Sequence, residues 1–205
     1  MHHNEEPHLI EIPKIFFSDL TGTPINKCIS CECNLLVEGT QYLIEKAIKP
    51  YKGHNSYSTI FEYAICMPCT HQMKNMISAK SMQRIMKYFS ANLDLAGRQE
   101  LMLKGDYSSV NPWIEQCMVK GINISEISEC QIYAQCNGEN LIFGEFPYMV
   151  SGVALDEVVE LLSAETLDDL ERFKNEHVDG PSIFQDLLQS GPKVSSKLPT
   201  TLEQA

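Results

Sequence analysis

Two pairs of cysteines constrain what this chain can fold into more than any other feature: Cys28 with Cys31, and Cys66 with Cys69. Each pair has the C-x-x-C spacing, which brings two sulfur atoms together within one tight turn. Two such pairs, a few tens of residues apart, can supply four thiolates to one tetrahedral Zn²⁺ at about 2.3 Å. The spacing therefore predicts one structural zinc ion, bound by Cys28, Cys31, Cys66 and Cys69.

Two neighbouring residues offer alternative ligands. Cys33 could compete with Cys28 or Cys31, or be a spare thiol, and His71 could replace Cys69. Many zinc knuckles place glycine directly after the second cysteine, where this chain has Glu32. Asn34, at the same knuckle, is among the few non-glycine residues that tolerate the left-handed backbone that such turns often need. The sequence leaves open whether Cys33 or His71 takes a ligand position.

The residues between the two cysteine pairs predict a β-hairpin. Residues 41–48 and 58–65 are strand-like runs joined by a turn-rich loop at 50–55. The second cysteine pair then lies between the second strand and a helical stretch from Thr70 to about Tyr88. Ser78 or Ser81 could cap a second helix within that stretch.

This order of knuckle, hairpin and cysteine pair at a helix N-terminus resembles the treble-clef class of zinc folds, with zinc ribbons as the near alternative. The resemblance covers Lys27 to Phe89, less than half of the chain. The whole chain resembles a family of uncharacterised bacterial proteins that contain a zinc-ribbon-like domain. The resemblance implies a structural zinc ion and carries no assigned activity.

The remaining residues predict a helix-rich C-terminal half with one more hairpin. We expect helices at 92–104, closed by Gly105, and at 113–119, after Asn111 and Pro112. The second hairpin pairs 129–135 with 140–146. Helices capped by Ser151 and Ser163 follow, and then a last short helix at 181–188.

The predicted fold class is α+β: a treble-clef-like zinc module, followed by a β-hairpin and several helices. We expect four parts along the chain. They are an N-terminal arm (1–24), the zinc-binding module with helices (25–105), the hairpin-plus-helices region (106–189) and a disordered tail (190–205).

Charge argues against nucleic acid as the main partner. The formal net charge is −11: residues 1–24 carry a surplus of three negative charges, 25–104 a surplus of four positive charges, and 105–205 a surplus of twelve negative charges. Four zinc-bound thiolates would reduce the positive surplus further, and the acidic half would repel phosphates. A nucleic-acid-binding zinc module stays an alternative, and it requires Lys74, Lys80, Arg84 and Lys87 to gather on one exposed face.

Targeting signals and reaction motifs are both missing from the sequence. No apolar run approaches the roughly 18 residues that a membrane span needs, and the first residues do not form a secretory signal. We therefore expect a cytoplasmic protein with no membrane contact, whose thiols stay reduced. The sequence contains no P-loop, G-x-G-x-x-G, G-x-S-x-G or H-E-x-x-H motif, so it names no reaction and does not favour an enzyme.

Two hypotheses of function follow from the cysteines. The favoured one is a structural-zinc protein with a binding, scaffolding or regulatory role through protein contacts. The alternative is a dithiol redox protein that uses Cys66 and Cys69, since thioredoxin-like folds also place a dithiol between a strand and a helix. We expect Cys117, Cys130 and Cys136 in the core, because their spacing fits no metal site. Any further role for these three is open.

Overall fold

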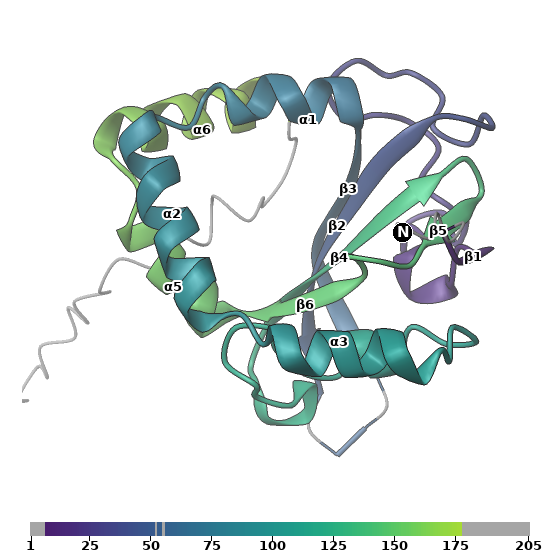
Figure 1. Cartoon of the computed structure of the whole chain (residues 1–205). Coiled ribbons are helices and arrows are strands. Elements are labelled where there is room, and N and C mark those ends of the chain that lie inside the picture. Colours follow the sequence, from purple (N-terminus) through teal and green to yellow (C-terminus); the bar gives the residue numbers. More distant parts are fainter. Residues whose placement is uncertain (1–6, 52, 55, 178–205) are drawn as a thin grey trace, which may run out of the picture.

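The computed structural model describes residues 7–51, 53–54 and 56–177 and contains an antiparallel sheet with helices beside it (Figure 1). Its strands are β1 (Leu9–Glu11), β2 (Gln41–Pro50), β3 (Tyr57–Cys66), β4 (Cys130–Asn137), β5 (Asn140–Ile142) and β6 (Tyr148–Ser151). Its helices are α1 (Met67–Lys74), α2 (Ala79–Asn92), α3 (Leu95–Lys104), α4 (Asn111–Ile114), α5 (Gly152–Glu160) and α6 (Ala164–His177). The expected mixture of helices and an antiparallel sheet is confirmed.

Both predicted hairpins form, and they join one sheet. The strand order is β1-β5-β4-β2-β3, and β6 pairs with the remaining part of the β4 edge. β2 pairs with β3 on one side and with β4 on the other, so residues 41–66 and 130–151 share this sheet. The sheet therefore contains strands from both sides of the boundary expected near residue 105.

One face of the sheet holds the core. Tyr42, Ile44 and Ile48 of β2 are almost fully buried there, at positions whose side chains alternate with those of the opposite face. Lys46 lies in the same row and is 0% exposed. Its Nζ donates to the carbonyl of Phe17 (2.8 Å) and forms ion pairs with Asp19 (2.6 Å) and Glu62 (3.0 Å). The contacts of this buried cation with Phe17 and Asp19 hold the N-terminal segment against the sheet.

The helical stretch predicted at 70–88 is two helices, α1 and α2. Ser78 begins the second of them, because its hydroxyl accepts a hydrogen bond from the main-chain N–H of Ser81 (3.2 Å). Ser163 begins α6 in the same way, by accepting from the N–H of Thr166 (3.3 Å). The two cap hydroxyls, Ser78 Oγ and Ser163 Oγ, lie 2.9 Å apart and fix the start of α2 to the start of α6.

The structure differs from the sequence prediction in the C-terminal half. α4 ends at Ile114 rather than Val119, because the chain turns after it and Cys117 N–H bonds to Ile122 O (2.9 Å). β6 was not expected, since Pro147 marked the end of the second hairpin. The helix expected at 181–188 and the tail at 190–205 lie outside the described residues.

None of the helices in the described part of the chain combines the length and the apolar character needed to cross a bilayer.

Candidate metal centre

Four cysteine thiols gather where the N-terminal segment meets the end of β3. The Sγ atoms of Cys28, Cys31, Cys33 and Cys66 all lie within 4.8 Å of one another, and we call these residues the cysteine cluster. Cys31 Sγ and Cys66 Sγ are 3.7 Å apart. Four sulfurs placed tetrahedrally at about 2.3 Å from zinc are separated by about 3.8 Å. The cluster therefore has the donor type and the spacing that a metal ion such as zinc requires.

A tight turn brings the first three of these cysteines together. Cys28 N–H bonds to Cys33 O (3.0 Å), and Glu32 N–H bonds to Cys28 O (2.9 Å). Glu32 has a φ of 58°, which makes it the one non-glycine residue with positive φ in the described part of the chain. The left-handed residue is therefore Glu32 and not Asn34, at the position where many knuckles have glycine. This conformation turns the chain so that Cys33 points back to the cluster.

Cys66 and Cys69 lie at the start of α1. Cys66 is the N-cap residue, and Pro68 lies in the first turn, so β3 passes directly into the helix. Cys66 N–H donates to Cys28 Sγ (3.4 Å), which ties this helix start to the knuckle. Unpaired N–H groups at a helix N-terminus favour nearby thiolates, as a metal centre needs.

The thiols of the centre differ in the environment that sets their pKa. The main-chain N–H of Cys33 bonds to the exposed Cys31 thiol and lowers its pKa to about 6. Burial raises the pKa of Cys66 to about 11 and that of Cys69 to about 12. A redox dithiol works through a thiol of lowered pKa, whereas burial raises the pKa of both Cys66 and Cys69.

Three of the four predicted zinc ligands belong to the cysteine cluster, and so does one of the two alternative ligands. Cys28, Cys31 and Cys66 belong to the cluster, whereas Cys69 lies beside it, with its thiol next to Cys31, Cys66 and Ser30. His71 is exposed and supplies no atom to the group. The sequence offered Cys33 only as a competitor of Cys28 or Cys31 or as a spare thiol, and the structure places it in the cluster. No local signal in the sequence marks Cys33 as a member of the cluster, because glutamate rarely adopts the positive φ found at Glu32.

The other three cysteines lie in the core, and the four cations named for nucleic-acid binding lie at the surface. Cys117, Cys130 and Cys136 are buried in the core, away from the cluster, as expected. The four cations named for nucleic-acid binding, Lys74, Lys80, Arg84 and Lys87, are exposed. The last three follow one another at intervals of four and three residues, so they share one face of α2.

A second polar group, which sequence reasoning missed, crosses the opposite face of the sheet. Tyr63, Glu45, Tyr133 and Tyr148 lie side by side on β3, β2, β4 and β6. Tyr63 donates to Glu45 Oε2 (2.6 Å). Burial raises the pKa of Glu45 to about 7, although the two hydroxyl neighbours Tyr63 and Tyr133 oppose the shift. The row forms because strands that are distant in the sequence pair with one another, so no local sequence pattern predicts it.

Comparison with protein-family models, with curated proteins and with solved structures finds no match in any of the three.

Proposed function

We propose that this protein binds one structural Zn²⁺ through Cys28, Cys31, Cys66 and Cys69, and that the zinc-bound module serves a binding or scaffolding role through protein contacts. The 3.7 Å separation of Cys31 Sγ and Cys66 Sγ, within a group of four thiols, carries the metal proposal. The sequence spacing selects Cys69 as the fourth ligand, and Cys33 is its rival. The order of knuckle, hairpin and helix supports a treble-clef-like module.

Zinc would act here as a cross-link between distant segments. Cys28 and Cys31 belong to the irregular N-terminal segment, whereas Cys66 ends β3 and caps α1. In the described residues this N-terminal segment has only the short strand β1 and the 3₁₀ turn Lys14–Phe16 before β2. Structural zinc sites contribute apparent binding energies of about 10–16 kcal/mol, much of it as folding energy. Metal binding would thus add a cross-link between this segment and the sheet to the contacts that Lys46 makes with Phe17 and Asp19.

Exposed apolar side chains on two helices support a role in protein contacts. Met86 on α2 is 65% exposed, and Leu95 and Leu103 on α3 are 57% and 87% exposed. Large apolar groups that face water often mark surfaces that bind other proteins. We keep the cytoplasm as the expected compartment, because free thiols persist where disulfides are reduced.

Metal content and thiol accessibility together test the zinc proposal. We expect tag-free protein, purified without added metal, to contain one zinc per chain by elemental mass spectrometry. The thiols of Cys28, Cys31, Cys66 and Cys69 should react with a thiol reagent only after chelation, since zinc-bound thiolates are protected. Absence of zinc together with a reversible disulfide between Cys66 and Cys69 would replace the proposal with the redox alternative.

The role in protein contacts is tested separately by quantitative purification from the native host. Leu103→Glu should lose one or more partners that the wild-type chain retains, because it places a charge within the exposed apolar surface of α3. Glu100→Gln, on the same helix, is the matched control and should retain them. Equal recovery by both variants would remove α3 from the proposal, and loss of bound material after nuclease treatment would favour the nucleic-acid alternative.

A further inference from the structure

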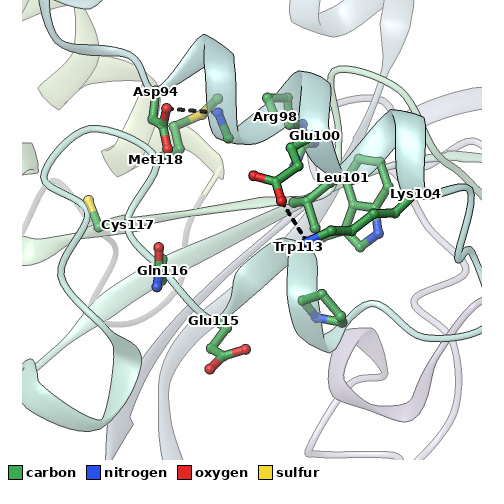
Figure 2. A pocket seen from close by; sticks show the side chains of 12 residues that line it. Asp94, Arg98, Glu100, Leu101, Lys104, Trp113, Glu115, Gln116, Cys117 and Met118 are labelled. Atoms are coloured by element: carbon green, nitrogen blue, oxygen red, sulfur yellow. Dashed lines mark hydrogen bonds and ion pairs between the residues drawn. The ribbon is translucent and has the colours of Figure 1, made fainter.

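A pocket of about 380 Å³ lies between α3 and residues 112–118 (Figure 2). Its lining combines apolar groups, among them Leu101, Pro112 and Met118, with charged side chains of both signs. An ion pair between Glu100 and Lys104 (2.9 Å) lies along the α3 side. Small-molecule sites typically have a volume of about 300–1,000 Å³, and this pocket falls within that range.

One of the two cations that line this pocket, Arg98, is buried and has no carboxylate partner among the described residues. Arg98 is only 9% exposed, and its Nη2 donates to the carbonyls of Glu145 (2.7 Å) and Pro147 (2.6 Å). Among the described residues it forms no ion pair, and its Nε has no acceptor. Burial accordingly lowers the pKa of this guanidinium to about 10. A buried cation in this state is a strong donor that lacks an anion.

A second unpaired donor lies against the first. Trp113 is 3% exposed, and its indole Nε1 also has no acceptor among the described residues. The Arg98 guanidinium carbon lies 4.3 Å from the centre of the indole ring, so the two groups are stacked. Buried N–H groups without acceptors are rare in folded proteins, and both of these belong to residues that line the same pocket.

We propose that this pocket binds a small zwitterion of amino-acid size, whose carboxylate accepts hydrogen bonds from Arg98 Nε–H and Trp113 Nε1–H. A carboxylate matches the planar donors of a guanidinium group. Asp94, Glu100 and Glu115 outnumber Arg98 and Lys104 in the lining. This balance disfavours a phosphate, with its higher negative charge, and favours a ligand whose other end is cationic.

The single tryptophan of the chain allows a direct test. In ¹⁵N-labelled protein, the indole N–H and Arg98 Nε–H resonances are followed by NMR while acetate, each of the twenty free amino acids, inorganic phosphate and chloride are added at constant ionic strength. We expect both resonances to shift saturably with carboxylates. At least one amino acid should bind about tenfold more tightly than acetate. Chloride should give no saturable shift, and phosphate should bind less tightly than acetate.

Two variants complete the test. Trp113→Phe keeps an aromatic ring and removes the donor, so the Arg98 resonance should report about tenfold weaker binding of the same amino acid. Arg98→Lys keeps the charge, loses the Nε–H donor and should weaken binding at least as much. If either variant fails to fold, the wild-type titrations decide alone. Absence of a saturable shift with every carboxylate, tighter binding of phosphate, or equal binding of acetate and all amino acids would overturn the proposal.

Discussion

Cys31 Sγ lies 3.7 Å from Cys66 Sγ, although 35 positions separate the two residues in the chain. The first stands in the knuckle of the N-terminal segment, and the second caps the helix that follows β3. The packing of the knuckle against the β2–β3 hairpin accounts for this approach: Ile29 N–H bonds to Ala64 O of β3 (2.8 Å). The contact joins two parts of the fold that zinc would hold together.

The choice of the fourth ligand is the first prediction. Cys69→Ser should abolish stoichiometric zinc binding, whereas Cys33→Ser should retain one zinc per chain, because two C-x-x-C hooks complete the tetrahedron. Elemental mass spectrometry of both purified variants checks this. The reverse pattern would assign the position to Cys33 and leave the centre itself in place.

The left-handed Glu32 gives a second prediction. Glu32→Gly should raise the free energy of unfolding by about 0.5–1 kcal/mol, since glycine adopts a φ of 58° without steric cost. Glu38→Gly is the matched control, because Glu38 is not among the described residues with positive φ. It should be neutral or lower stability by roughly 0.5 kcal/mol, through the greater flexibility of the unfolded chain. Urea unfolding of the zinc-loaded proteins measures both, and a loss of stability in Glu32→Gly would contradict the account of the knuckle.

A third prediction concerns pH and Glu45. Burial holds its pKa at about 7, above the ordinary value of 4.5, so the folded state retains a proton that the unfolded state loses. Ionisation of Glu45 should therefore cost about 2–3 kcal/mol of stability as the pH rises from 5 to 8. Tyr63, Tyr133 and Tyr148 beside it have raised pKa values and stay neutral throughout this range.

Glu45→Gln removes this ionisation. The difference in unfolding free energy between the variant and the wild type should grow by about 2–3 kcal/mol from pH 5 to pH 8, in favour of the variant. Glu38→Gln, which makes the same change at an exposed glutamate, is the matched control. A flat profile for Glu45→Gln would mean that the carboxyl group titrates normally.

The contact between the caps of α2 and α6 gives a fourth prediction. Ser163→Ala removes the cap of α6, the hydrogen bond between the Ser163 and Ser78 hydroxyls (2.9 Å) and the one that the Ser163 hydroxyl accepts from Ser81 Oγ (3.2 Å). We expect a loss of about 1–2 kcal/mol in the free energy of unfolding. Ser90→Ala, whose hydroxyl bonds only to Lys87 O on the same exposed surface, should change it by less than about 0.5 kcal/mol. Equal effects would show that the cap contact does not stabilise the helices.

Local sequence patterns predicted much of the fold. The alternation and turn residues of 41–48 and 58–65 located β2 and β3 to within two residues, and Ser78 was one of two candidates for the cap that divides α1 from α2. β6 was missed, because a four-residue strand after a proline is stabilised by its pairing with β4 and has no strong local signal. The joining of the two hairpins through β2 and β4 was missed for the same reason.

The candidate site was predicted in part. The C-x-x-C spacing alone predicted that Cys28, Cys31 and Cys66 lie close together, because each C-x-x-C pair and the helix that begins after Cys66 are local features of the sequence. Cys33 joins them only through the positive φ of Glu32, and a glutamate in the sequence does not predict that backbone conformation. Arg98 and Trp113 come from separate helices and meet only in the folded chain, so their unpaired donors leave no trace in the sequence.

X-ray absorption at the zinc K-edge of the purified protein tests the central claim most directly. The account predicts one zinc per chain, surrounded by four sulfur atoms at about 2.3 Å and no nitrogen or oxygen ligand. A shell of nitrogen or oxygen atoms, or protein that folds fully without bound metal and gives no zinc edge, would contradict it.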